Sequence, residues 1–161
     1  MINFIILPNQ LFDINYLKKE NITNNKYKIF IYEHPQYFTK YNFNKKKLIL
    51  HYSSIKYYKE YLKNKNYKVE IIKYTDKFKI KDYEMFKSAD NINLIPNKIY
   101  DNPNYLLNTE LHDKYKEKTK NNKTLLFNNF YMWSKKELGI LPNVKSKDKM
   151  NRKRMPKEIK I

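Results

Sequence analysis

Residues 28–73 constrain the fold more than any other segment of the chain. They contain an apolar stretch at 28–32, a polar turn, a long segment with helical periodicity, and a second apolar stretch at 68–73. Two parallel strands need a connection of roughly a dozen residues or more, usually a helix, and this connection is almost always right-handed. We therefore expect a right-handed strand–helix–strand unit, with a parallel sheet built around it.

The connecting helix has a predicted start and a predicted buried side. Asn44 is a suitable N-cap for a helix that begins just after it. Apolar residues then recur at helical spacing and form one stripe that we expect to pack on the sheet. The residues of this stripe are Leu48, Tyr52, Ile55, Tyr58 and Leu62.

Further strands are predicted on both sides of this unit. Residues 3–7 (NFIIL) form an apolar run ahead of Pro8, which is typical of a strand buried on both faces. Downstream we expect a turn or two of helix at 82–87 and a short fourth strand at either 92–95 or 98–100. The predicted fold class is α/β: a Rossmann-like three-layer domain with a short parallel sheet, followed by helices.

Those helices are predicted at 110–118 and 124–138. The second is followed directly by Gly139, the single glycine of the chain, in the position that commonly ends a helix. The basic tail at 143–161 has no periodicity, and we expect it to be poorly ordered by itself.

Composition excludes several kinds of chemistry. Phosphate-cradling loops need several glycines, and the chain has one. With no cysteine there is no disulfide and no cysteine-ligated metal or iron–sulfur cluster. The histidines at 34, 51 and 112 do not have metal-ligand spacing. A triad of Ser53, His34 and Asp13 lacks the motif that would support it. We assign no catalytic residue.

The chain is strongly basic, with 34 Lys and Arg against 16 Asp and Glu and a formal net charge of +18. Such a charge attracts polyanions, including DNA. However, the lysines are spread along the chain, and a surplus of Lys, Asn, Ile and Tyr is what an AT-rich genome produces. Both interpretations stay open. No apolar run approaches a membrane span, and the N-terminal apolar run is too short for a signal peptide. We therefore expect no membrane association and a cytoplasmic location, or a location in the virion or host cytoplasm if the source is viral.

Two polar residues are candidates for ligand binding. Glu33 ends the second strand, and Gln10 lies just past the first. Ligands of open α/β sheets bind outside the carboxyl ends of strands. The alternative is that Glu33 pairs with a nearby lysine. Aromatic residues between 37 and 43, followed by Lys45–Lys47, could stack on single-stranded nucleic acid or fill the rim of a core.

Several segments occur in an order that is similar to one known family. Residues 7–11 read LPNQL, and the second strand ends in Glu33. The other segments are 45–50 (KKKLIL), 57–62, 67–72 (YKVEII), 101–106 (DNPNYL), 130–133 (FYMW), 138–141 (LGIL) and 151–156 (NRKRMP). The chain thereby resembles the deoxyribodipyrimidine photolyase-related proteins, the bacterial cryptochrome and six-four photolyase group with an iron–sulfur cluster.

This resemblance implies a function with clear limits. It makes residues 1–107 an N-terminal α/β antenna domain and 108–161 a helical linker and basic tail that would lead into a missing FAD domain. In the family, this domain looks like the part that binds a ribityllumazine antenna chromophore. The resemblance therefore implies that Glu33 and Gln10 bind the cofactor. The family's activity is DNA repair, but its FAD and its cluster cysteines would lie beyond residue 161.

The resemblance also shows departures. Pro8 and Asn9 replace the family's glycine and aspartate, and the segment after the third strand looks shortened by about one strand–helix unit. We therefore expect a truncated or split protein, inactive alone, which works with a separately encoded catalytic domain. The alternative is a small basic nucleic-acid-binding protein that kept the fold.

Overall fold

The computed structural model describes residues 1–104, 108–119 and 127–140. The chain divides into two compact units, Met1–Glu110 and Leu111–Ile161. The predicted boundary after residue 107 adjoins residues 105–107, which lie outside the described residues, and it stays a prediction.

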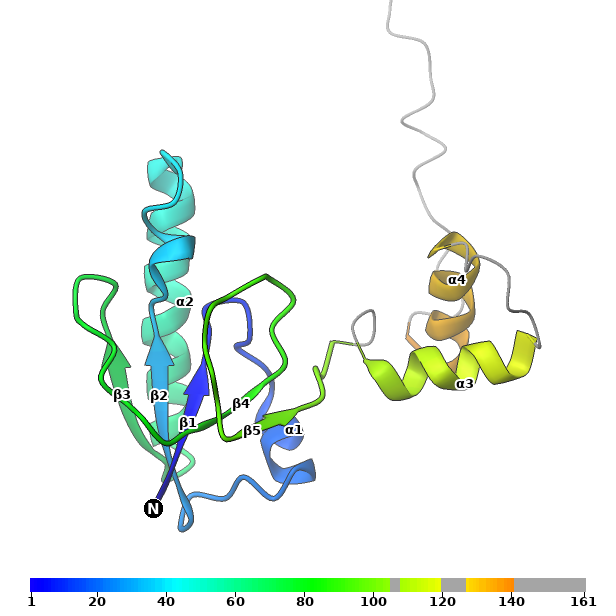
Figure 1. Ribbon diagram of the computed structural model, residues 1–161, viewed down its shortest axis with the longest axis horizontal. Helices are drawn as coiled ribbons and strands as arrows, with labels where there is room; N and C mark the ends of the chain where they lie inside the picture. Colours follow the sequence, from blue (N-terminus) through cyan, green and yellow to red (C-terminus); the bar gives the residue numbers. More distant parts are fainter. Residues whose placement is uncertain (105–107, 120–126, 141–161) are drawn as a thin grey trace, which may run out of the picture. The chain divides into compact units, whose positions relative to one another are not determined.

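The first unit is built on a five-stranded parallel sheet (Figure 1). Its strands are β1 (Ile2–Ile6), β2 (Tyr27–Tyr32), β3 (Lys68–Ile72), β4 (Glu84–Phe86) and β5 (Lys98–Tyr100), in the order β3-β2-β1-β4-β5. Every neighbouring pair is parallel. The predicted α/β, Rossmann-like fold class is confirmed. β1 lies at the centre, which explains why its apolar run is continuous instead of alternating.

Two helices cover one face of the sheet. They are α1 (Ile14–Lys19), which follows β1, and α2 (Lys45–Lys63), which connects β2 to β3. The predicted N-cap is confirmed, since the Asn44 side chain accepts a hydrogen bond from the backbone N–H of Lys46 at 2.8 Å. The predicted stripe of α2 packs on the sheet with α1 and with the side chains of Phe4, Ile6, Ile29 and Ile31.

The opposite face has no helix among the described residues, and we call it the helix-free face. Two connections cover it, 73–83 and 87–97, and both cross in front of the sheet in Figure 1. They bury a second cluster of sheet residues beneath partly buried apolar side chains of the connections. The sheet residues are Ile5, Phe30, Tyr32 and Met85. Leu7, directly after β1, belongs to the same cluster, and the connections add Phe78, Ile80, Ile92 and Leu94.

Chain direction explains why the layers differ. From β1 to β3 the strands are added in one direction, and right-handed crossovers place α1 and α2 on the same face. The step from β3 to β4 runs back past β1, so a right-handed crossover must lie on the opposite face. Here that crossover is 73–83, which contains no helix. The third predicted layer therefore exists as packed connections.

One local prediction was wrong. Residues 82–87 were expected to be helical, but they contain strand β4, whose Ile5↔Met85 pairing places it beside β1. A strand of three residues is too short to show an alternating pattern, and pairing with the central strand decides its conformation. The fourth predicted strand is present at 98–100 as β5. Residues 92–95 belong to the connection before it.

The second unit contains an aromatic helix pair. The two helices are α3 (Thr109–Thr119), which starts at the end of the first unit, and α4 (Phe127–Glu137), and both were predicted. The ring of Phe130 packs against His112 and Tyr115, with centroid distances of 4.1 and 5.5 Å. The predicted basic tail lies outside the described residues.

Gly139 ends α4 as predicted. Its φ of 63° is left-handed, a conformation that glycine adopts without a steric penalty. The backbone N–H of Ile140 donates to the carbonyl of Lys135 at 2.9 Å, and that of Gly139 donates to Lys136 at 3.2 Å. This pair of bonds is the Schellman motif, which satisfies carbonyl groups at the end of a helix.

Candidate functional site at the carboxyl edge of the sheet

The order of the strands reverses at β1, which lies between β2 and β4. In open α/β sheets, the crevice outside the carboxyl ends of strands at such a reversal is the usual ligand site. Three segments meet there: residues 7–10 after β1, residues 87–90 after β4, and the short 3₁₀ helix η1 (Pro35–Tyr37) after β2.

Gln10 joins the ends of β1 and β4. Its side chain is 1% exposed. The Nε2 group donates to the carbonyls of Phe86 at 3.1 Å and Lys87 at 3.2 Å. Its Oε1 accepts from the backbone N–H of Leu7 at 3.3 Å. The amide therefore positions the two strand ends, and any contact with a ligand stays a prediction.

A carboxylate receives two side-chain donors beside Gln10. Tyr37 donates its hydroxyl to Asp90 Oδ2 at 2.6 Å, and Asn9 Nδ2 donates to the same oxygen at 3.0 Å. Burial raises the pKa of Tyr37, and its hydrogen bond to Asp90 raises that pKa further. Tyr37 is therefore a neutral donor. We call Asn9, Gln10, Tyr37 and Asp90 the switch-point cluster.

η1 holds Tyr37 in place. His34 caps this short helix, because its Nδ1 accepts a hydrogen bond from the backbone N–H of Gln36 at 3.2 Å. An accepting Nδ1 requires the neutral imidazole. Burial lowers the pKa of His34, which favours that same neutral form.

Glu33 lies at the carboxyl end of β2 and is 3% exposed. One oxygen, Oε2, accepts from the backbone N–H of Tyr74 at 3.4 Å. Burial raises the pKa of Glu33, while that hydrogen bond and the charge of Lys73 partly offset the increase. Among the described residues no lysine lies within ion-pair distance of this carboxylate. The carboxyl group is thus buried without a paired cation in this part of the chain.

Aromatic rings pack beside Glu33. Phe38 and Tyr74 are nearly parallel, with centroids 5.4 Å apart and an interplanar angle of 7°. Tyr52 packs on Phe38 at 5.3 Å. Burial raises the pKa of Tyr52 to about 12, with further contributions from its hydrogen bond to Tyr74 and from the charge of Glu33. We call Glu33, Phe38, Tyr52 and Tyr74 the Glu33 cluster.

Glu33 and Gln10, the two predicted site residues, lie at the same edge of the sheet but are not hydrogen-bonded to each other. Each side chain binds backbone groups of another segment. The link between the clusters is η1, since Tyr37 belongs to one and the next residue, Phe38, to the other.

Sequence reasoning missed Asp90. The signal that could have identified it is its position just after a central strand, but β4 was interpreted as helical. Asn9 was noted only as a departure from the family pattern, and Tyr37 only as an aromatic residue that could stack on nucleic acid.

The side chains of Asp13, His34 and Ser53 have structural roles or face solvent. Asp13 and His34 cap α1 and η1, and Ser53 is exposed on α2, so the three do not form a triad. No group of three metal-ligating side chains occurs among residues 1–104, 108–119 and 127–140. Over the same residues, no helix is long and apolar enough to cross a membrane.

The fold defines a Rossmann-like α/β domain whose strand order reverses at β1. The chain matches the model of the deoxyribodipyrimidine photo-lyase-related protein family over residues 4–92, and it belongs to this family. The match contains both clusters. Four of the similar segments lie outside the matched range, namely 101–106, 130–133, 138–141 and 151–156. Parts of these segments also lie outside the described residues: 105–106, 141 and 151–156. No curated protein matches the chain.

Proposed function

We propose that the α/β domain is an antenna-like module of a photolyase-related system that binds a planar heteroaromatic chromophore, such as a ribityllumazine, at the carboxyl edge of β1 and β2. The observation that carries this proposal is the Glu33 cluster. It combines a buried carboxyl group with a parallel aromatic pair, within the residues that match the family.

The chemistry of this cluster suits such a ligand. A carboxyl group with a raised pKa can accept a hydrogen bond from a ring N–H, or donate one when it is protonated. Phe38 and Tyr74 stack on each other, and when Tyr74 moves aside the Phe38 ring would offer a flat apolar surface to a fused ring. The switch-point cluster lies at the same edge and supplies polar groups that could orient a ribityl chain.

Access requires a local rearrangement. Because Glu33 is 3% exposed, a ligand reaches it only when Tyr74 and the start of the 73–83 connection move. The hydrogen bond to be replaced is long, at 3.4 Å between Tyr74 N and Glu33 Oε2, and is therefore weak. A ligand group that hydrogen-bonds Glu33 more closely would compensate for its loss.

We propose no catalytic role for this domain alone. Light-driven electron transfer in a photolyase-related system depends on a flavin, which carries the redox chemistry. We assign that chemistry to a partner that supplies the flavin site, and Glu33 and Gln10 to the antenna. A neighbouring gene that encodes a cysteine-bearing helical domain would support the split arrangement.

The direct test is chromophore binding. We expect the purified protein to bind added ribityllumazine, with quenching of ligand fluorescence on titration and with riboflavin as a second probe. Glu33→Gln keeps an acceptor for Tyr74 but removes the ionisable group, and it should weaken binding at least about tenfold, as loss of a charge-assisted hydrogen bond does. Glu70→Gln, at an exposed position on β3, is the matched control. A protein that binds neither probe would overturn the antenna proposal.

A further inference from the structure

We infer that the helix-free face carries a binding site for single-stranded nucleic acid, formed by Lys77, Lys79 and Lys81 together with the cavity beside them. This inference rests on other residues and another ligand than the proposed antenna function, although both sites adjoin the 73–83 connection. We call these three residues the lysine row.

The lysine row is held by apolar side chains that alternate with it. The ring of Phe78 packs on Tyr32, with centroids 4.7 Å apart, and on Tyr83 at 5.3 Å. Ile80 packs on the same cluster. Because alternate residues turn toward the sheet, the three lysines are exposed on the outside of the connection. The connection that replaces a covering helix thus presents three cations at regular spacing.

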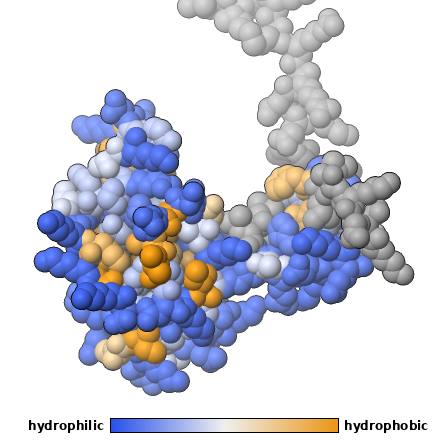
Figure 2. All heavy atoms as spheres, viewed as in Figure 1, coloured by the Kyte–Doolittle hydropathy of each residue, from blue (hydrophilic) through white to orange (hydrophobic). Residues whose placement is uncertain are grey.

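A cavity of about 480 Å³ opens between this connection and the sheet. Ligand pockets usually measure roughly 300–1,000 Å³, so a nucleobase fits within it. Its walls combine apolar side chains from β2, β3 and the connection with charged groups from the connection. The lining residues are Phe30, Ile71, Ile72, Ile80, Asp76, Lys77 and Lys79. Figure 2 shows apolar residues in the middle of this side of the domain with hydrophilic residues around them.

The nearby carboxylates are engaged elsewhere. Asp76 accepts hydrogen bonds from Lys73 N at 3.3 Å and from Thr75 Oγ1 at 3.2 Å. Asp82 accepts from Asn97 at 3.3 Å, and Glu70 forms an ion pair with Lys28 at 2.6 Å. Among the described residues, none of these carboxylates lies within ion-pair distance of the lysine row. The row is therefore available to an external anion.

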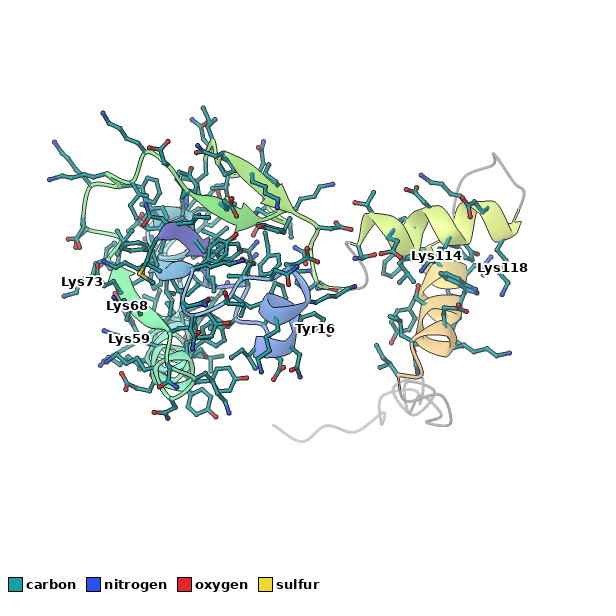
Figure 3. All side chains as sticks on the ribbon, turned by 90° about the horizontal axis from the view of Figure 1, so that it is seen from below. Tyr16, Lys59, Lys68, Lys73, Lys114 and Lys118 are labelled. Atoms are coloured by element: carbon teal, nitrogen blue, oxygen red, sulfur yellow. The ribbon has the colours of Figure 1, made fainter. Side chains whose placement is uncertain are left out.

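Further lysines extend the positive charge along the adjoining edge. Lys68 and Lys73, which are labelled in Figure 3, lie at the two ends of β3 and are both exposed. A ligand that enters the cavity therefore approaches through a positive field, which raises the rate of association with a polyanion.

The arrangement favours a strand over a single nucleotide or a duplex. Lys77 and Lys79 line the cavity, whereas Lys81 is not part of its lining. When one base occupies the cavity, Lys77 and Lys79 lie beside that nucleotide. Lys81 then stays available for the phosphate of the next nucleotide in the chain. A paired duplex keeps its bases stacked, so none could enter the apolar cavity. Single-stranded sites combine a basic groove with apolar surfaces for bases in this way.

A second basic surface serves as the control. Lys45, Lys46 and Lys47 are exposed in the first turn of α2, and the Nζ of Lys47 lies 4.5 Å from the centroid of the Phe43 ring. Replacing these three lysines by glutamine changes the net charge as much as replacing the lysine row does. The two triple variants therefore separate a localised site from general attraction to a basic protein.

The test is fluorescence anisotropy with a labelled oligo(dT) of about 20 nucleotides at about 50 mM salt. We expect Lys77→Gln/Lys79→Gln/Lys81→Gln to weaken binding at least about tenfold, and to reduce the slope of log affinity against log salt by about 2, for three lost phosphate contacts. The control triple variant should bind within about threefold of the original protein. Equal loss in both variants, or loss in the control alone, would overturn the inference.

Two further ligands test the shape of the site. An abasic oligonucleotide of the same length should bind several-fold more weakly, because it cannot fill the cavity; equal binding would overturn the assignment of a base to it. A free mononucleotide that competes as well as oligo(dT) would contradict a strand-binding site. Far-UV circular dichroism of each variant verifies that the fold is retained, so that weaker binding reports the surface itself.

Discussion

Tyr37 and Phe38 are neighbours in the chain, yet they serve different clusters at the carboxyl edge. The Tyr37 hydroxyl donates to Asp90, whereas the Phe38 ring packs on Tyr74 and Tyr52. Tyr37 is the last residue of η1 and Phe38 is its C-cap, and their side chains reach different clusters at the end of this short helix. The geometry of the edge therefore depends on η1 and on the residue that caps it.

Tyr37→Phe tests the switch-point cluster. The change removes the hydroxyl that donates to Asp90 and leaves Asn9 as the remaining side-chain donor to that oxygen. We expect the free energy of unfolding to fall by about 0.5–1.5 kcal/mol, the usual net value of one hydrogen bond. Urea denaturation measures it. Tyr41→Phe, at a position that is 64% exposed, is the control and should change stability little; a similar loss in both variants would contradict this assignment.

His34 predicts a pH dependence. Burial lowers its pKa below the ordinary value of 6.5 in the folded protein. Just below pH 6.5, His34 therefore binds more protons in the unfolded chain than in the folded protein. The stability that the neutral His34 contributes is present above that pH and is lost as the pH falls toward the lowered pKa.

His34→Asn isolates this effect, because asparagine can also cap η1 but does not titrate. The loss of stability between about pH 7.5 and 5.5, measured from urea midpoints, should be smaller in the variant than in the original protein. His51, whose pKa is also lowered by burial, is unchanged in both proteins. An identical pH dependence of the two proteins would show that His34 does not contribute.

At the scale of elements, α2 connects sequence pattern to fold most directly. Its apolar stripe was visible in the sequence because nineteen residues, Lys45–Lys63, span several helical turns. Ile55 is at the centre of this stripe and is 1% exposed. Together with α1 this helix covers one face of the sheet, so its packing contributes to the stability of the whole domain.

Ile55→Ala should destabilise the domain by about 2–5 kcal/mol, since it removes buried methyl groups and leaves a cavity. Thermal or urea unfolding followed by far-UV circular dichroism measures the change. Lys56→Ala, one residue along on the exposed side of the helix, should stay within about 0.5 kcal/mol of the original protein. If the two variants lost similar stability, the assignment of the buried face of α2 would be wrong.

For the whole molecule, sequence reasoning predicted the elements whose signals are local. The first three strands, α2 and both C-terminal helices carry long apolar patterns or caps such as Asn44 and Gly139. β4 could not be recognised, because three residues carry no period and their conformation depends on β1, which is distant in the chain. Asp90 was missed for the same reason.

The predicted site shows a similar limit. Topology predicted that Glu33 and Gln10 lie at the carboxyl edge of the sheet, since both follow parallel strands, whereas their role in cofactor binding was implied by the family resemblance and stays a prediction. What their side chains contact could not be predicted. Gln10 binds the carbonyls of Phe86 and Lys87, and Glu33 accepts from Tyr74, so each depends on a segment that arrives from elsewhere in the chain.

The central position of β1 also has a consequence for how the chain folds. β1 can pair with β2, and β2 with β3, across connections that contain helices, but the other neighbour of β1 must come from residues 84–86. Until then, one edge of β1 presents unpaired backbone groups beside Phe4 and Ile5, which is a template for aggregation. Pairing β1 with β4 closes the long loop between residues 6 and 84, which costs chain entropy and slows folding. The reversal of strand order at β1 thus leaves the newly made chain open to misassembly until residues 84–86 pair with β1.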